Sequence, residues 1–231
     1  MLPIYGLEKS SLLDYPGKVC AVVFLYGCNL KCPYCHNPEL VVEECPESVL
    51  IEQDDVLEFL KKRIGKLDSV VITGGEPLIH TELFDFVKKV KNLGFLVKID
   101  TNGLLPNSLK KYLTSGYVDY VAMDVKYPSD EYNDRSGNKN AQSCILKSIS
   151  VILNSNVNYE FRTTYVKGIH NSQSVRKICQ MIQGSKRYYI QNFREGKSID
   201  KSLTNQNSFT PNELDEFKKI ALEYIDNVEI R

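Results

Sequence analysis

Six short runs of β-branched and aromatic residues, separated by longer amphipathic stretches, constrain the fold of this 231-residue chain more than any other feature. The runs cover residues 19–26, 69–73, 96–100, 117–124, 158–166 and 188–193, and apolar residues recur at helical spacing in residues 54–64, 83–93 and 211–224. Repeated βα units of this kind build a parallel sheet covered by helices. The alternation therefore predicts an α/β fold.

Six strands fit a partial (β/α)6 barrel of the TIM type better than a closed barrel of eight, although periodicity alone leaves an open doubly wound sheet as the alternative. In both architectures the loops after the carboxyl ends of the strands build the functional site. Residues 27–35, 74–77, 101–103 and 125–126 follow the first four predicted strands. We therefore expect functional residues in these segments.

Composition and charge limit the domain count and the partners. The chain has no Pro/Gly/Ser-rich linker, so we expect one domain over residues 1–231, with a core of about residues 12–194 and a C-terminal extension of helix and strand over about residues 195–231. Lys plus Arg and Asp plus Glu both number 29, which argues against nucleic acid as a partner. Neither an export signal nor a membrane span is recognisable, so we expect a cytoplasmic protein with no membrane partner.

Three of the seven cysteines, Cys28, Cys32 and Cys35, lie on the loop after the first predicted strand. The odd total and this crowding favour metal binding in a reducing compartment over disulfide bonds. Three thiolates on one loop can hold one [4Fe-4S] cluster and leave one iron without a protein ligand. Such an iron can bind the amino and carboxylate groups of a substrate and pass an electron to it.

A zinc site of these three cysteines and His36 is the alternative for the same loop, since tetrahedral zinc accepts this ligand set. We favour the cluster, because ligand pairs in structural zinc sites are normally separated by two or more residues, whereas Cys35 and His36 are adjacent. With zinc bound, the chain would be a metal-stabilised interaction domain without turnover. His80 and His170 lack spaced ligand partners, so we expect them to be structural or surface groups.

Residues 27–38, Gly-Cys-Asn-Leu-Lys-Cys-Pro-Tyr-Cys-His-Asn-Pro, resemble the cluster loop of radical S-adenosylmethionine (SAM) enzymes. His36 and Asn37 make the loop most similar to that of the activating enzymes of glycyl radical enzymes. The chain as a whole resembles the activating proteins of anaerobic ribonucleoside-triphosphate reductase, over about residues 12–194. The resemblance implies that the reduced cluster cleaves SAM to a 5′-deoxyadenosyl radical, which then takes a hydrogen atom from a glycine of a partner enzyme.

The same resemblance implies which residues contact SAM, with Tyr34 of the cluster loop among them. Gly74, Gly75, Glu76 and Pro77 are similar to the family motif that contacts the methionine amino group, and the glycines allow the backbone to approach a ligand with its amide and carbonyl groups open. Asp100, Thr101 and Asn102 resemble a segment of pyruvate formate-lyase activating enzyme and offer a polar cradle for a ribose, a carboxylate or a cation. Asp124 and Lys126 resemble an Asp-x-Lys pair near the SAM carboxylate. Without the resemblance, these segments fit a simple turn, an Asx turn and a solvated loop.

Two further candidates depart from the family pattern or admit another role. After the sixth predicted strand, Gln191 and Asn192 stand where the pyruvate formate-lyase activator has a histidine that contacts the cofactor, and we take Gln191 as the candidate. Arg162 offers a fixed fork of donors to an anionic group, or an ion pair with Glu160 in the barrel wall.

The resemblance also implies two protein partners. Asp14 precedes Tyr15, Pro16 and Gly17 at the place where glycyl radical activators have an Asp-Gly-Pro-Gly segment facing the glycine loop of the substrate, so we expect Asp14 to contact the partner; an ordinary turn acid is the alternative. Only Cys45 lies between Cys35 and Gly74, which predicts a single cluster. The electron donor is then a separate protein, a flavodoxin or ferredoxin.

Two other functions within the family remain open at this point. The 7-carboxy-7-deazaguanine synthases share the cysteine loop in related form and act on a small molecule. Asp14 and the continuation His36-Asn37-Pro38 favour an activator over such an enzyme. Pyruvate formate-lyase or another glycyl radical enzyme can also be the partner, because these targets present similar glycine loops.

Overall fold

Eight strands form one sheet in the computed structural model, which describes residues 1–41 and 44–231. Across the sheet the strands follow chain order, with bounds β1 Ile4–Ser11, β2 Cys20–Leu25, β3 Ser69–Gly74, β4 Leu96–Thr101, β5 Tyr120–Asp124, β6 Asn158–Tyr165, β7 Tyr188–Asn192 and β8 Val228–Ile230. β1 is antiparallel to β2, and the later neighbours all pair in parallel. Because the order does not reverse within the described residues, the doubly wound alternative is wrong and the α/β partial-barrel fold is confirmed.

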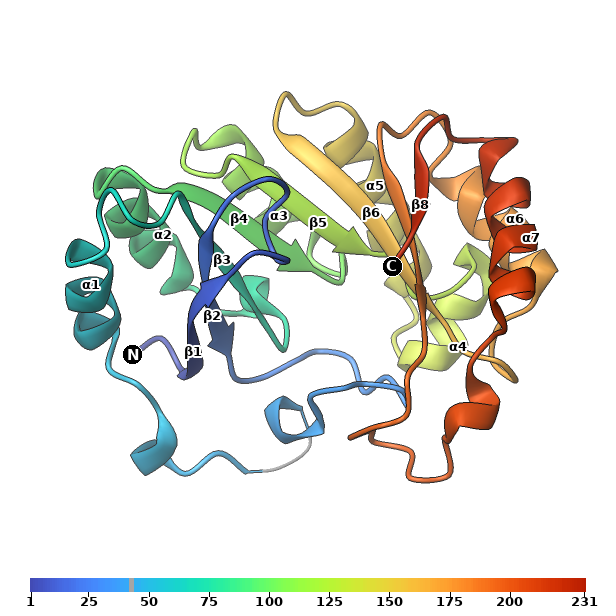
Figure 1. Cartoon of the computed structure of the whole chain (residues 1–231), viewed down its shortest axis with the longest axis horizontal. Helices are drawn as coiled ribbons and strands as arrows, with labels where there is room; N and C mark the ends of the chain where they lie inside the picture. The colour runs from blue at the N-terminus through green and yellow to red at the C-terminus, as the bar shows by residue number, and fades with distance from the viewer. Residues whose placement is uncertain (42–43) are drawn as a thin grey trace.

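The helices cover the outer, convex side of the curved sheet (Figure 1). Their bounds are α1 Gln53–Lys61, α2 Leu83–Asn92, α3 Pro106–Thr114, α4 Tyr132–Ser136, α5 Ala141–Leu153, α6 Ser172–Met181 and α7 Pro211–Leu222. Alternate strand residues such as Ile72, Ile99 and Phe161 face these helices and are almost completely buried. This layer between sheet and helices is the main hydrophobic core.

The three helices described by residue range from the sequence correspond to α1, α2 and α7. α7 begins as its capping pattern predicts: Thr210 Oγ1 accepts from the Glu213 N–H, and Glu213 accepts from the Thr210 N–H. The predicted end of α1 is wrong by three residues, since residues 62–64 turn away after Lys61. The helix propensity of that segment does not distinguish a last helical turn from the turn that follows it.

The sequence analysis did not predict β1, and it expected a strand in the C-terminal extension without giving its bounds. β1 carries Glu8, Lys9 and Ser10 at exposed positions, so it lacks a continuous apolar run. β8 has only three residues, too few for a period of two to be recognised. β5 also begins at Tyr120 rather than at residue 117, because the Asp119 carboxylate accepts hydrogen bonds from Val97 N–H and the Lys91 ammonium and thereby holds a turn before the strand.

The inner, concave face of the sheet divides into an apolar base and a polar upper part. Tyr15, from the loop between β1 and β2, packs there with Cys20, Val22, Val71 and Tyr120 in a small cluster separate from the main core. Further along the strands, toward their carboxyl ends, the inward positions are polar, as at Asp100 on β4, Asp124 on β5 and Arg162 on β6. The fold thus places a small apolar cluster at the base of the concave face and a polar site at the strand ends.

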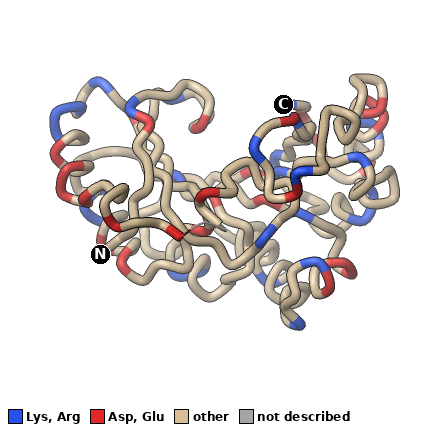
Figure 2. The backbone as a smooth tube through the Cα atoms, turned by 90° about the horizontal axis from the view of Figure 1, so that it is seen from below, with Lys and Arg blue, Asp and Glu red and all other residues tan. Residues whose placement is uncertain are grey.

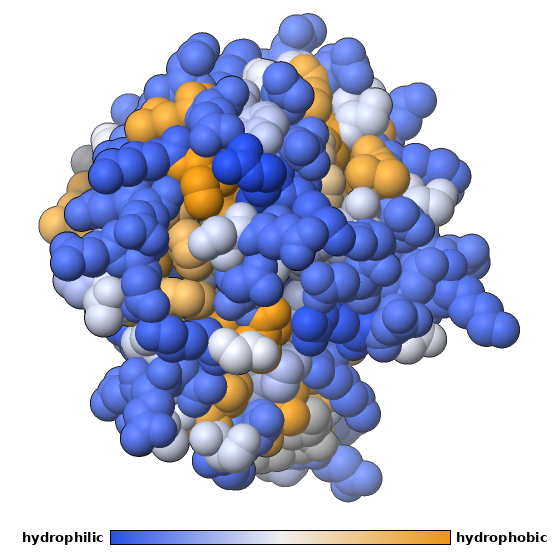
Figure 3. All heavy atoms as spheres, turned by 90° about the vertical axis from the view of Figure 1, so that its right-hand side faces the viewer, coloured by the Kyte–Doolittle hydropathy of each residue, from blue (hydrophilic) through white to orange (hydrophobic). Residues whose placement is uncertain are grey.

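The outer surface shows mixed charge and scattered apolar residues. Seen from the side on which the cysteine loop lies, Lys and Arg are interspersed with Asp and Glu (Figure 2). The side with α6 and α7 is mostly hydrophilic, with small separate apolar areas (Figure 3). No helix among the described residues has the length and apolar character needed to cross a membrane.

Candidate active site

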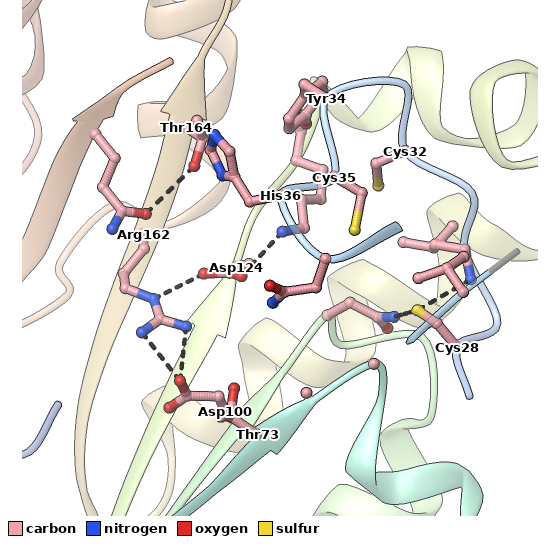
Figure 4. Close-up of a pocket in the computed structure, with 18 of the residues that line it drawn as sticks. Cys28, Cys32, Tyr34, Cys35, His36, Thr73, Asp100, Asp124, Arg162 and Thr164 are labelled. Atoms are coloured by element: carbon pink, nitrogen blue, oxygen red, sulfur yellow. Dashed lines mark hydrogen bonds and ion pairs between the residues drawn. The ribbon is translucent and has the colours of Figure 1, made fainter. Parts of the chain in front are cut away.

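A cavity of about 710 Å³ opens at the carboxyl ends of the parallel strands. All the candidate site residues except Glu76 and Pro77 line it, namely Asp14, Cys28, Cys32, Tyr34, Cys35, Gly74, Gly75, Asp100, Thr101, Asn102, Asp124, Lys126, Arg162 and Gln191. Segments far apart in the sequence therefore meet at one place (Figure 4). Their convergence follows from the parallel sheet, whose strand ends share one edge.

The cysteine loop forms one wall of the cavity. The backbone closes a turn from Cys35 N–H to the Cys32 carbonyl, 3.0 Å. The thiols of Cys28, Cys32 and Cys35 are partly exposed and not in disulfides, and their sulfur atoms face the same space (Figure 4). Cys28 Sγ accepts from Leu30 N–H at 3.4 Å and from Asn102 Nδ2 at 3.8 Å. Three accessible thiols on one wall are the donor set of an iron–sulfur cluster, so the residues present fit this group.

His36 is directed away from a shared site with the three thiols. Its Nε2 lies 3.2 Å from the Arg194 carbonyl oxygen, and its ring stacks on Phe193 with centroids 5.8 Å apart. His36 thus packs against Phe193 and Arg194, and these contacts do not support it as a fourth ligand beside the three thiols.

Gly74 and Gly75 allow β3 to pack against the cysteine loop. Gly75 N–H donates to the Leu25 carbonyl and Glu76 N–H to the Gly27 carbonyl, both at 2.8 Å. A Cβ atom on Gly75 would lie 1.9 Å from the Gly27 carbonyl oxygen. The amides of Gly75 and Glu76 are therefore used by the protein backbone and are not open to a ligand, whereas the expectation for the carbonyl groups stays a prediction. The two glycines still line the cavity.

Glu76 is completely buried behind the cavity wall. Its carboxylate accepts from Leu78 N–H at 3.1 Å, Thr101 Oγ1 at 2.8 Å and Asn102 N–H at 2.6 Å. Burial raises the pKa of Glu76 and these hydrogen bonds lower it. The effect of burial is the larger one, so the pKa is raised to about 7. Pro77 begins the short 3-10 helix Pro77–Ile79, which follows directly. Glu76 thus joins the ends of β3 and β4, and through them supports the cavity wall.

Asn102 forms the Asx turn that was the local alternative for its segment. Its Oδ1 accepts from Leu104 N–H at 3.0 Å. Its Nδ2 donates to Asn29 Oδ1 at 2.7 Å, in addition to the contact with Cys28 Sγ. The turn therefore orients the amide toward the cysteine loop.

Four charged side chains form a continuous row along the cavity. Lys126 Nζ lies 2.9 Å from Asp124 Oδ2, Arg162 Nε lies 2.7 Å from Asp124 Oδ1, and the Arg162 guanidinium lies 3.2 Å from Asp100 Oδ2. The Arg162 to Glu160 distance is longer, 3.9 Å. Arg162 is therefore primarily paired with two carboxylates at the site, and its pair with Glu160 is secondary.

The row of charges fixes protonation states. Burial alone would raise the pKa of Asp124, but the charges of Arg162 and Lys126 outweigh it and hold this pKa below the ordinary aspartate value. Burial alone would lower the pKa of Lys126, but Asp124 raises it above the ordinary lysine value. The site thus presents the cations of Lys126 and Arg162 and the ionised carboxylate of Asp124 to a bound molecule.

Tyr34 and Lys126 join the cysteine loop to this row of charges. The Tyr34 hydroxyl donates to the Lys126 carbonyl oxygen at 3.3 Å, and burial raises the Tyr34 pKa well above its ordinary value. His170 Nε2 lies 2.9 Å from the same oxygen. His170 is buried and structural, as the sequence led us to expect, but its contact with Lys126 had no local signal because the two residues are far apart in the chain.

Gln191 and Asn192, the two candidates after the sixth predicted strand, have different surroundings. Gln191 Oε1 accepts from Thr164 Oγ1 at 3.3 Å beside the cavity. Asn192 exchanges two hydrogen bonds with the Phe209 backbone, at 2.8 and 2.9 Å, and so anchors the chain before α7. Of the two, Gln191 is the one whose side chain is not committed to the backbone of another segment.

Several lining residues were missed by the sequence analysis. They include Thr73, Thr164, Arg194, Glu195 and Arg231. Arg194 and Glu195 follow the strand predicted over residues 188–193, and that position was an available signal. Arg231 follows β8, a strand whose bounds the sequence analysis did not give.

Comparison with known proteins identifies the family. The model of the radical SAM superfamily matches residues 22–182. A Methanocaldococcus jannaschii protein provisionally named a glycyl-radical enzyme activating enzyme is 36% identical over 233 residues, which span 99% of this chain and 95% of that protein. The pyruvate formate-lyase-activating enzyme of Clostridium pasteurianum is 30% identical over 78% of this chain and 76% of its own length. The 7-carboxy-7-deazaguanine synthase of Methanopyrus kandleri is 28% identical over 68% of this chain and 70% of its own length.

Solved structures support the fold. Streptococcus suis SuiB bound to S-adenosylmethionine superposes with a TM-score of 0.66 at 15% identity, over 91% of this chain and 51% of SuiB. Escherichia coli coproporphyrinogen III oxidase, described as a radical SAM enzyme, superposes with a TM-score of 0.58 at 11% identity, over 91% of this chain and 53% of that chain. This protein therefore belongs to the radical SAM superfamily, whose enzymes use a [4Fe-4S] cluster and S-adenosylmethionine.

Proposed function

We propose that this enzyme is an activase that generates a glycyl radical on a partner enzyme, and that the partner is an anaerobic ribonucleoside-triphosphate reductase. The observation that carries the activase proposal is the 36% identity over 99% of the chain to the protein named a glycyl-radical enzyme activating enzyme. The choice of partner rests on the resemblance of the whole chain to the activating proteins of this reductase. The charged cavity beside three thiols supports the chemistry.

Cys28, Cys32 and Cys35 hold the cluster in this proposal. When bound and reduced, the cluster supplies the electron that cleaves SAM into methionine and a 5′-deoxyadenosyl radical. The chain binds and orients SAM and excludes water from the site. Burial raises the pKa of the Cys28 thiol to about 11, so cluster binding, which requires the thiolate, releases a proton there.

The row of charges suits the methionine part of SAM. Lys126 and Arg162 are permanent cations that can bind a carboxylate, while Asp100 and Asp124 can accept from an ammonium group. The backbone at Gly74, Gly75 and Thr101 lines the same region. We assign these residues to the cofactor, with Glu76 and Pro77 supporting the wall from behind.

The remaining candidates surround the rest of the cavity. Tyr34 lines one wall, Gln191 offers an amide to a polar group, and Asn102 lies between Thr101 and the cysteine loop. Asp14 lines the cavity from the loop between β1 and β2. We assign Tyr34, Asn102 and Gln191 to the cofactor and Asp14 to the partner.

A protein substrate is compatible with the open barrel. Within the described residues β1 and β8 are the two edges of the sheet and do not pair with each other (Figure 1). A peptide segment can therefore approach the cavity without unfolding the sheet. A flavodoxin or ferredoxin supplies the electron, since we propose one cluster and no further redox centre on the chain.

The test is an anaerobic assay with reconstituted protein and the reductase, in which methionine, 5′-deoxyadenosine and the glycyl radical signal in electron paramagnetic resonance are measured together. We expect all three, and their loss in Cys28→Ala, Cys32→Ala and Cys35→Ala. Cys144→Ala, on the outer helix α5, is the matched control and retains all three. SAM cleavage without a glycyl radical on the reductase would reject this partner, and no cleavage by protein with a full cluster would reject the chemistry.

The similarity to a 7-carboxy-7-deazaguanine synthase supports a small-molecule enzyme as the second candidate. The same assay separates the two if the reductase is left out and small-molecule extracts are offered in its place, with 7-carboxy-7-deazaguanine sought among the products. Formation of that product without activation of any glycyl radical enzyme would favour the synthase.

A further inference from the structure

Lys98 is a buried cation on the concave face that the sequence analysis did not single out. It lies on β4, two residues before Asp100, and only 1% of its surface is exposed. A buried ammonium group is costly unless several acceptors surround it. Lys98 Nζ lies 3.3 Å from Asp100 Oδ1 and 3.8 Å from Glu160 Oε1, and it donates a hydrogen bond to the Asp14 carbonyl oxygen.

The Asp14 carbonyl belongs to residues 12–19, the loop that joins β1 to β2 and turns over the concave face. Two contacts join this loop to β4 and β5: the bond from Lys98, and the ring of Tyr15 against Tyr120, with centroids 5.5 Å apart. The other end of the loop is open to solvent, since Leu12 and Leu13 are 74% and 85% exposed. The loop is thus held on one side and free on the other.

Lys98 connects this loop with the row of charges at the cofactor site. Asp100, its partner, is also paired with Arg162, and Arg162 is paired with Asp124. The ammonium group donates to the Asp14 carbonyl and lies within ion-pair distance of Asp100 and Glu160. An apolar side chain of equal length would leave the carbonyl without this donor and would remove one of the cations beside the two carboxylates, which keep Arg162 and, for Glu160, Arg231.

We infer that Lys98 is a positioning residue that fixes Asp14 at the cavity rim relative to Asp100, and thereby sets where the partner's peptide segment docks relative to the cofactor. This inference rests on the proposed function, because it concerns a protein substrate. Lys98 itself contacts neither substrate nor cofactor. Its effect passes through the backbone of Asp14 on one side and the carboxylate of Asp100 on the other.

Hydrogen–deuterium exchange of the purified chain tests, without turnover, whether Lys98 holds Asp14 and its loop in place. In Lys98→Met we expect faster exchange confined to residues 12–19. Lys91→Met is the matched control, because Lys91 also pairs with an aspartate, Asp119 at 2.6 Å, but belongs to the outer helix α2. Exchange that rises equally throughout the sheet, or does not rise in residues 12–19, would overturn the positioning role.

Kinetics of the reconstituted enzyme test whether Lys98 affects docking of the partner's peptide segment. For Lys98→Met we expect the KM for the partner to rise about tenfold, the loss that follows removal of a charged hydrogen bond of about 1.4 kcal/mol. The KM for SAM should rise less than this, and 5′-deoxyadenosine should form in excess of the glycyl radical. Lys98→Arg, which keeps the charge, should bring the partner KM and the amount of 5′-deoxyadenosine formed per glycyl radical part of the way back to the wild-type values.

The outcomes separate this inference from the proposed function. Wild-type protein that forms no glycyl radical on any partner would reject the function, whereas an unchanged partner KM in Lys98→Met with normal wild-type activity would reject the role of Lys98. If Lys98→Met does not fold, Lys98→Gln takes its place. Faster exchange in residues 12–19 and a raised partner KM are then expected, and wild-type values for both would overturn the inference.

Discussion

Tyr34 and His170 share one hydrogen-bond acceptor, the backbone carbonyl of Lys126. The Tyr34 hydroxyl lies 3.3 Å and His170 Nε2 2.9 Å from this oxygen. His170 Nδ1 accepts from Val166 N–H at 3.0 Å, so Nε2 carries the proton of the neutral ring. Burial lowers the pKa of His170 to about 4, which keeps the ring neutral and in this tautomer at physiological pH. The cysteine loop and the loop after β6 are thus joined through the peptide that carries Lys126.

This shared acceptor predicts a cooperative loss of stability. Tyr34→Phe and His170→Phe each leave the carbonyl one donor, whereas the double variant leaves it none. We expect the loss of each donor to lower the free energy of unfolding by about 1 kcal/mol. The double variant should lose about 1 kcal/mol more than the sum of the two, because a buried carbonyl without any donor carries its full desolvation cost. Urea unfolding of the four proteins measures the coupling.

The control for this cycle is Tyr224→Phe, in the turn after α7, which changes a hydroxyl that accepts from Arg176 on α6. Tyr34→Phe combined with Tyr224→Phe should be additive. His170→Phe also removes the acceptor of Val166 N–H, but that cost appears in both the single and the double variant and cancels in the cycle. Additive losses for Tyr34 and His170 would show that the two bonds are independent.

Because Gly75 is closely packed, we expect a large loss of stability even from its substitution by alanine. In Gly75→Ala the new Cβ would lie 1.9 Å from the Gly27 carbonyl oxygen, a backbone atom next to Cys28. The cysteine loop or the end of β3 must then move, so we expect a loss of at least about 2 kcal/mol in stability and a reduced iron content after reconstitution. Gly196→Ala is the control, since no atom lies within 4 Å of its Cβ position. Equal iron content in both variants would contradict this account.

Arg162→Met should reverse the way in which the contribution of Asp124 to the free energy of unfolding depends on pH in the wild-type protein. In the wild-type protein the pKa of Asp124 is held below its ordinary value of 3.8, so this aspartate stabilises the fold above about pH 4 and the stabilisation is lost as the pH falls further. Without Arg162, the effect of burial raises the pKa of Asp124, and its ionised form becomes unfavourable as the pH rises. We therefore expect a deficit of about 3 kcal/mol at about pH 7 that shrinks toward about pH 4. Urea unfolding across this range measures it, and a deficit independent of pH would point to lost packing alone.

The sequence was sufficient for features that depend on local spacing or on strand order. Cys28, Cys32 and Cys35 lie within one loop, and Asp100 and Asp124 lie at strand ends that a parallel sheet brings to one edge. Local patterns therefore predicted the contents of the cavity well. They could not predict contacts made through the fold, such as those of His170 and Lys126, which are 44 residues apart.

Burial of polar side chains is a second feature that the sequence did not show. Lys98 alternates with apolar residues on β4 and looks like a solvent-facing position, but the curvature of the sheet and the loop over residues 12–19 enclose it. Glu76 belongs to a motif expected to contact the ligand, and it lies behind the wall because three donors converge on it there. The sequence does not show which side of a wall a polar side chain occupies.

Glu76 provides a prediction about the effect of pH on folding. Its pKa is raised from the ordinary value of 4.5 to about 7 in the folded state, so the folded protein binds a proton that the unfolded chain releases between these values. Stability from this group is therefore greatest below about pH 4.5 and falls as the pH rises through about 7. The difference corresponds to about 3 kcal/mol at about 1.4 kcal/mol for each pH unit.

Glu76→Gln removes this titration and isolates it from other groups. The amide cannot ionise, but its NH2 would face one of the three donors, so the variant should be less stable than wild type at about pH 5. As the pH rises to about 8, wild type loses the contribution of protonated Glu76 and the variant does not, so the gap between them should narrow by about 3 kcal/mol. Urea unfolding at both pH values measures the gap, with the exposed Glu216→Gln as a control that should show no such change. A gap that widens with pH would mean that the three hydrogen bonds outweigh burial and that Glu76 is ionised in the folded protein at neutral pH.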